Sequence, residues 1–258
     1  MSDDYSPGDP MRAAQRNMRP AAVRRFYAEA SAEPSAGGFA LRLDGRGART
    51  PAGNPLVFPT LPLAALVAQE WAGQGETIDP ASMPVTRIAN SAIDGVAATM
   101  AETRAELAAY AESDLLCYRA DAPEELVDAE AKAYDPVLDW VRETFGAKFV
   151  AVQGVTHARQ PEQALLAIRA ELRALDDPFA LTALHAMTTL TGSILLALAV
   201  LRGRLGAGEA WRVAHVDEDF QIARWGEDDE AMARRAARWR EMEAAAKVGA
   251  AAIAGRGF

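Results

Sequence analysis

The longest apolar stretch of the chain runs from Phe179 to Leu201, and its pattern predicts a helix buried on nearly all sides. Asp177 and Pro178 mark its start, because aspartate caps free backbone N–H groups and proline suits the first helical turn. A stretch of this length could also cross a bilayer. His185 and several hydroxyl side chains in its first half favour a central core helix instead.

A second helix is predicted from about Glu209 to Trp225, and both of its faces are apolar. One face should pack on the core, and the other needs a further partner to cover it. The pattern leaves open which face has which role. At helical spacing, one face carries Trp211, Ala214, Glu218, Ile222 and Trp225, and the opposite face carries Val213, Val216, Phe220 and Ala223.

Glu218 lies in the middle of the tryptophan-bearing face. A buried carboxylate without a partner is costly, so this side chain needs either a partner or water. One interpretation is an internal ion pair with one of the many arginines. The other is an anchor point for a second protein, in which aromatic side chains surround a charge. On this second interpretation the candidate partner-binding residues are Trp211, Asp217, Glu218, Ile222 and Trp225.

Residues 24 to 59 carry the main signals of β structure, and residues 148–155 are predicted to be a strand or an extended connector. Phe39, Leu41 and Leu43 alternate with other side chains, and Asp44-Gly45 then predicts a hairpin turn. Helical patterns dominate from about residue 84, with one extended segment near 148–155. We therefore expect an α+β protein. Its predicted parts are a flexible tail (1–22), a small antiparallel, β-rich N-terminal domain (23–82) and a larger, mainly helical C-terminal domain (83–258).

Composition narrows the classes of partner. The 258 residues carry a net charge of -9, which argues against nucleic acid and anionic membrane surfaces as main partners. The single cysteine, Cys117, cannot form an internal disulfide and fits a reducing compartment. The first residues are acidic and polar and resemble neither a secretory signal nor a transit peptide. We expect a cytoplasmic protein without stable membrane insertion.

Candidate catalytic chemistry is sparse. His215, Asp217 and Glu218 form the one compact group of titratable side chains, and on a helix His215 and Glu218 are neighbours. A local ion pair is the simpler interpretation, and a small-ligand or metal-dependent enzyme is the alternative. Cys117 lies in an apolar context typical of a core residue. No glycine-rich phosphate loop occurs, and we expect neither a metal nor a cofactor.

Many short motifs, each weak alone, occur in one order between Phe26 and Ala246. Together they resemble the ATP synthase assembly chaperones that bind the alpha subunit. Small departures are Gly47-Ala48 and Phe220. The motifs include Leu43-Asp44-Gly45-Arg46, Arg49-Thr50-Pro51, Glu70-Trp71, Met83-Pro84-Val85-Thr86-Arg87, Asp114-Leu115-Leu116-Cys117-Tyr118-Arg119, Val216-Asp217-Glu218 and Trp225-Gly226-Glu227-Asp228.

The resemblance implies a non-enzymatic chaperone that holds the unassembled alpha subunit until a beta subunit replaces it. It also implies a small β-rich domain on a larger helical one, and no nucleotide hydrolysis by the chaperone itself. Lacking a transit peptide, the chain resembles a bacterial member of the family. An unassembled alpha subunit exposes a surface that tends to aggregate, so a holdase needs a complementary apolar and charged patch. The doubly apolar helix with Glu218 is our candidate for part of it.

Overall fold

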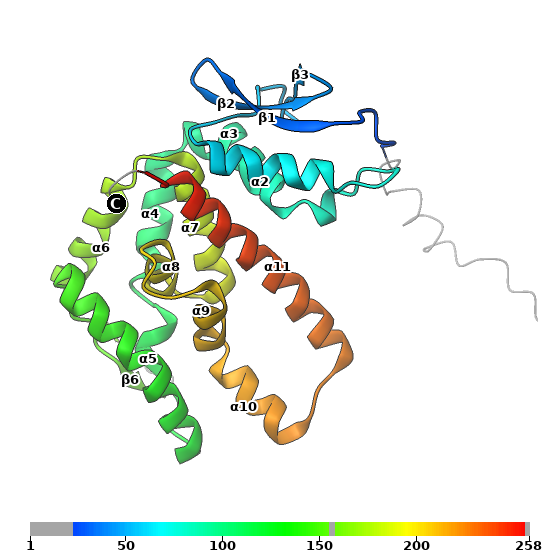
Figure 1. Ribbon diagram of the computed structural model, residues 1–258. Coiled ribbons are helices and arrows are strands. Elements are labelled where there is room, and N and C mark those ends of the chain that lie inside the picture. The colour runs from blue at the N-terminus through cyan, green and yellow to red at the C-terminus, as the bar shows by residue number, and fades with distance from the viewer. Residues whose placement is uncertain (1–22, 155–157, 256–258) are drawn as a thin grey trace, which may run out of the picture.

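A small antiparallel sheet lies at one end of the molecule and helices form the rest (Figure 1). The computed structural model describes residues 23–154 and 158–255, so the predicted tail at 1–22 lies outside the described residues. Strands follow the order β1-β2-β3, and β4 also pairs with β2. The strands of the sheet are β1 (Ala30–Ser35), β2 (Gly38–Leu43), β3 (Arg46–Gly47) and β4 (Val57–Phe58).

The predicted hairpin is confirmed. Asp44 and Gly45 both have positive φ, 49° and 72°, as a tight two-residue turn between twisted strands requires. The Asp44 carboxylate also accepts hydrogen bonds from the backbone N–H groups of Ala28 and Glu29. Strand β1 was not predicted, because its sequence contains Pro34 and resembles a polar loop. Proline is tolerated there because β1 lies at the edge of the sheet.

The helical part confirms the predicted α+β class. A parallel strand pair, β5 (Tyr118–Arg119) and β6 (Val152–Gln153), accounts for part of the extended segment expected near 148–155. Buried apolar side chains from the sheet and the helices join in one hydrophobic cluster. The helices are α2 (Leu61–Ala72), α3 (Pro84–Asp94), α4 (Met100–Tyr110), α5 (Glu124–Phe145), α6 (Glu162–Ala174), α7 (Pro178–Thr191), α8 (Ile194–Leu201), α9 (Ala207–Ala214), α10 (Val216–Trp225) and α11 (Asp229–Ala252).

The central helix is interrupted, which corrects the prediction of one helix up to Leu201. Gly192 adopts a left-handed conformation (φ 71°) and ends α7. Ser193 then caps α8 by accepting a hydrogen bond from the Leu196 N–H. Both segments are buried in the core, as the prediction of a core helix required. No helix within 23–154 and 158–255 is long and apolar enough to span a membrane.

A buried carboxylate, Asp114, holds this interruption in place. It accepts hydrogen bonds from the Ser193 hydroxyl at 2.7 Å and from the Leu195 N–H at 3.1 Å. It also accepts a hydrogen bond from the Leu116 N–H at 3.1 Å. It therefore caps both the start of α8 and the short 3-10 helix Leu115–Cys117. Burial raises the pKa of Asp114 to about 6, although these hydrogen bonds oppose the rise.

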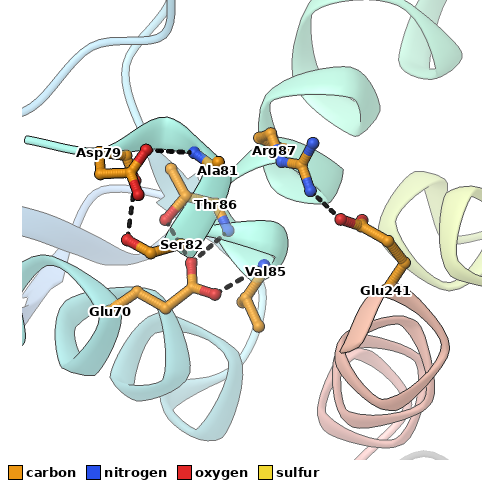
Figure 2. A network of polar contacts seen from close by, with 8 residues as sticks. All are labelled: Glu70, Asp79, Ala81, Ser82, Val85, Thr86, Arg87 and Glu241. Carbon is orange, nitrogen blue, oxygen red and sulfur yellow. Dashed lines mark hydrogen bonds and ion pairs between the residues drawn. The ribbon is translucent and has the colours of Figure 1, made fainter. Parts of the chain in front are cut away.

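A second carboxylate, Glu70 of α2, connects this helix to the start of α3 (Figure 2). It accepts hydrogen bonds from the Val85 N–H at 2.8 Å and the Thr86 N–H at 2.7 Å, at the start of α3. A carboxylate is favourable at this positive helix end. Beside it, Arg87 pairs with Glu241, so α3 is also tied to α11 (Figure 2).

Helix α11 packs very closely on the central helices through its second half. A side chain at Gly249 would place its Cβ 3.0 Å from Leu201 Cδ1 and 3.5 Å from Ala183 Cβ. A methyl group at this position would therefore require the Leu201 side chain to shift by a few tenths of an ångström. The first half of α11 is mostly exposed and carries several arginines, whereas alanines fill the buried half.

Replacing Asp114 with alanine should destabilise the protein by about 3 kcal/mol, because it leaves a buried hydroxyl and buried N–H groups without an acceptor. Urea unfolding would measure this change. The matched control is Asp176→Ala, since Asp176 is exposed and pairs only at the surface with Arg104. A loss for Asp114→Ala no larger than for Asp176→Ala would contradict the role of Asp114 as a double cap.

Candidate partner-binding site

The helix predicted from 209 to 225 consists of two helices, α9 and α10, that meet at His215. The φ of this residue is -119° and its ψ is 26°, so the helical backbone is interrupted there. The two predicted faces therefore do not continue along one axis. This is a correction, and it separates Trp211 on α9 from the other candidate residues on α10.

Trp211 lies in the interior, only 7 % exposed. Its ring centroid is 5.7 Å from that of Trp239 on α11 and 3.9 Å from that of His215. His215 Nδ1 also lies 2.7 Å from the Trp211 carbonyl oxygen, and burial lowers the pKa of the imidazole. Trp211 thus fixes α9 onto α11 and does not present a surface to a partner.

Glu218 is neither enclosed nor tightly paired. Its side chain is 40 % exposed, and its Oε2 atom lies 3.9 Å from His215 Nε2 and 4.0 Å from Arg235 Nε. The Arg235 side chain makes a much shorter contact with Asp219, at 2.5 Å. The internal ion pair that the sequence allowed is therefore present only as long contacts, and part of the carboxylate surface stays accessible.

Asp217 interacts with α5 on another side of α10. Its side chain forms a hydrogen bond with the Glu130 carboxyl group. Glu130 Oε2 also accepts a hydrogen bond from the Ala120 N–H at 2.8 Å. Burial is the main cause that raises the pKa of Glu130 to about 7, and Asp217 adds to it. A protonated Glu130 can donate to the Asp217 carboxylate, so this pair links the two helices.

The outer end of α10 is the most exposed part of the candidate site. Trp225 is 74 % exposed and Ile222 is half-buried. None of the ten residues of α10 is buried. Glu218, Ile222 and Trp225 thus give this helix an accessible surface on which a charge and two apolar side chains occur together.

The alternative prediction was a small-ligand or metal-dependent enzyme, but the side chains of His215, Asp217 and Glu218 do not converge on one point. His215 contacts Trp211, Asp217 contacts Glu130, and Glu218 lies nearest to His215 and Arg235. Within the described ranges, no group of three or more His, Cys, Asp or Glu side chains could hold a metal ion. His157 lies outside those ranges.

Cys117 is buried, as predicted for a core residue. Burial, with a smaller contribution from the Asp114 charge, raises the pKa of its thiol to about 12. A thiol in this state is a poor nucleophile at neutral pH, because the thiolate is the reactive form.

A groove of about 610 Å³ lies between α5 and the α9–α10 pair. Val213, Val216 and Phe220 line it, so this predicted face is also partly uncovered. Sequence reasoning missed the α5 side of the groove. Its signal was the small pair Ala129 and Ala133, four residues apart and followed by Pro136, in a helix that also carries many charged residues.

Comparisons with known proteins agree with this architecture. Residues 24–142 match a family model described as ATP12 chaperone protein. The crystal structure of Atp12 from Paracoccus denitrificans is 45% identical, with a TM-score of 0.84 over 89% of this chain and 98% of that one. A point mutant of the same protein gives a TM-score of 0.83, also at 45% identity, over 88% of this chain and 97% of that one.

A third solved structure is a protein from Agrobacterium tumefaciens that is provisionally described as a chaperone. It is also 45% identical, with a TM-score of 0.87 over 95% of this chain and 92% of that one. The family model ends within α5, whereas the structural matches cover most of the chain.

Two substitutions of the same kind test the different positions of the two tryptophans. Trp211→Ala should cost about 3 kcal/mol of unfolding free energy, because it leaves a cavity between α9 and α11. Trp225→Ala should change stability by no more than about 0.5 kcal/mol, because the side chain is exposed. Thermal and urea unfolding would measure both, and equal losses would contradict the assignment.

The Glu130–Asp217 pair predicts a pH effect on stability. With a pKa of about 7 in the folded protein and 4.5 as its ordinary value, Glu130 binds a proton more strongly when folded. Its stabilisation is therefore full below about pH 4.5 and is lost as the pH rises through 7. Glu130→Gln keeps a donor for Asp217 at every pH. It should exceed the wild type by about 1 kcal/mol at pH 8.

Urea unfolding at about pH 5 and pH 8 would measure this difference between the two proteins. The advantage of Glu130→Gln should grow with pH, because only the wild type loses its proton. A difference that stays constant between the two pH values would contradict a raised pKa of Glu130 in the folded protein.

Proposed function

Because this chain belongs to the ATP12 chaperone family, we propose that it holds the unassembled alpha subunit of the F-type ATP synthase soluble sector until beta replaces it. The motif series between residues 26 and 246 supports this client, and the similar solved structures are described as Atp12 or as a chaperone. The observation that carries the site is α10, a helix without a buried residue that presents Glu218, Ile222 and Trp225.

The physical requirement on such a protein is a surface that replaces a missing subunit. Before assembly, an alpha subunit exposes an interface that beta later covers, and exposed apolar surface of that kind favours aggregation. Exposed tryptophan is a frequent centre of binding energy in protein interfaces. Trp225, with Ile222 beside it along α10, offers that type of contact without any rearrangement of the core.

Glu218 would add charge selection to this apolar contact. Its nearest internal cation, Arg235, is 4.0 Å away and is engaged with Asp219, so a cationic group of the client can approach the open side of the carboxylate. Charge complementarity of this kind fixes register and rejects wrong partners. A basic group on the alpha subunit is therefore the expected counterpart of Glu218.

The five predicted site residues take two roles in this proposal. Glu218, Ile222 and Trp225 contact the client directly. Trp211 supports α9 from beneath, and Asp217 orients α10 through its contact with Glu130. The role is binding, in keeping with neighbours described as chaperones, and it involves no catalytic step.

We place this activity in the bacterial cytoplasm. The composition suits a reducing compartment because a single cysteine cannot form an internal disulfide, and the matched structures come from bacteria. Neither nucleic acid nor a membrane is part of the proposed interaction.

Glu218→Lys should keep the fold and weaken capture of purified alpha subunit by about tenfold or more, since it places a cation where a basic client group is expected. Pull-down and titration with labelled alpha subunit would measure capture, and thermal unfolding would check the fold. The matched control is Glu33→Lys at the sheet end of the molecule, which should bind normally (Figure 1).

Two outcomes separate the site from the function. Capture by Glu218→Lys at wild-type strength would remove Glu218 as a recognition residue and leave family membership intact. Failure of the wild-type protein to capture free alpha subunit under the same conditions would contradict the proposed client.

A further inference from the structure

The groove between α5 and α9–α10 lies on a different side of α10 from the Glu218 contacts. Its lining combines apolar side chains from both walls: Ala133, Pro136 and Val137 from α5, and Val213, Val216 and Phe220 from α9 and α10. A volume of about 610 Å³ falls within the range of roughly 300–1,000 Å³ that is typical of ligand sites in proteins.

Positive charge surrounds this apolar floor. Lys132, Arg204 and Arg212 line the groove, all three are exposed, and none forms an ion pair within the part of the chain that the structure describes. Arg224 stacks over the Phe220 ring, 5.1 Å from its centroid. The cations are notable because the whole chain carries a net charge of -9.

The acidic side chains of the groove do not balance these cations. Asp219 is already neutralised by Arg235 on α11, at 2.5 Å. Only Glu209 then remains against the three basic side chains that line the groove. An occupant with carboxylates would therefore gain favourable interactions at the rim, where charge complementarity guides association and register.

We infer that this groove binds an acidic, amphipathic segment of the client polypeptide, whose apolar side chains enter the groove while its carboxylates meet Lys132, Arg204 and Arg212. The inference rests on the proposed function, because the client is the alpha subunit. Helix α10 would then contact the client on two sides, with Glu218 facing a basic group and the groove facing an acidic segment. The absence of buried residues in α10 leaves both sides open.

The first arm of the test is charge reversal in the full-length protein, with purified alpha subunit as the probe. Lys132→Glu combined with Arg212→Glu should weaken capture by about tenfold or more. The matched control is Lys148→Glu combined with Arg46→Glu, which changes net charge equally at exposed positions outside the groove. This control should bind like the wild type.

A second arm locates the contact directly. A photoreactive amino acid at Ala133, in the groove, should form an adduct with the alpha subunit, and the same group at Ala36, at the sheet end, should not. Mass spectrometry should find the adduct on a peptide with apolar side chains and carboxylates. If charge reversal unfolds the protein, Lys132→Gln with Arg212→Gln replaces it, and capture should then lose part of its salt dependence.

Each result decides the inference. Wild-type capture that survives charge reversal, without an adduct at Ala133, overturns the groove and leaves the proposed function standing. An adduct with a second copy of this chain, or with its own residues 1–22, overturns the client as occupant. No capture by the wild type overturns the proposed function and this inference together.

Discussion

The enclosure of α7 by other helices is the constraint on which the rest of the molecule depends. This helix is buried along nearly its whole length and contacts α3, α4, α8 and α11. Its threonines remain compatible with the core because their hydroxyls donate to carbonyls one turn earlier. Three such bonds run from Thr182 to Pro178, from Thr188 to Leu184 and from Thr191 to Met187.

The core is built around α7, and helix α10 lies at the periphery. Its described contacts are mainly polar, and none of its residues is buried. Asp217 meets Glu130 on α5, and Asp219 meets Arg235 on α11. A segment with few buried contacts belongs to the less stable part of a fold. Such a helix can adjust its position at little cost to the core.

The sequence predicted those features that short-range chemistry decides. The Asp44-Gly45 turn and the core helix begun by Asp177 both follow from neighbouring residues, and the structure contains them. Strand β1 was not predicted, because Pro34 and the polar residues around it are typical of a loop as well as of an edge strand. The end of α7 at Gly192 was not predicted because its stabilising partner, Asp114, is distant in sequence.

The sequence predicted the part of the candidate site that lies on α9 and α10, but not the part of the groove that lies on α5. Periodicity placed Trp211 and Trp225 on one face, but the change of backbone direction at His215 sends the first tryptophan inward and leaves the second exposed. One wall of the groove is formed by α5, including Ala133 and Pro136. The role of these two residues cannot be predicted without knowing which helix lies opposite them. Pairing between distant helices is therefore the information that local pattern did not contain.

The close approach at Gly249 has a consequence for how this family can vary. A Cβ atom at position 249 would lie 3.0 Å from Leu201 Cδ1 and 3.5 Å from Ala183 Cβ, so a larger side chain there would displace neighbouring atoms. The alanine-rich second half of α11 therefore suits a close interhelical spacing. The arginine-rich first half is mostly exposed and has no such restriction. Substitutions should therefore accumulate unevenly along one continuous helix, with its solvent-facing half free to diverge between organisms while the buried half keeps its small residues.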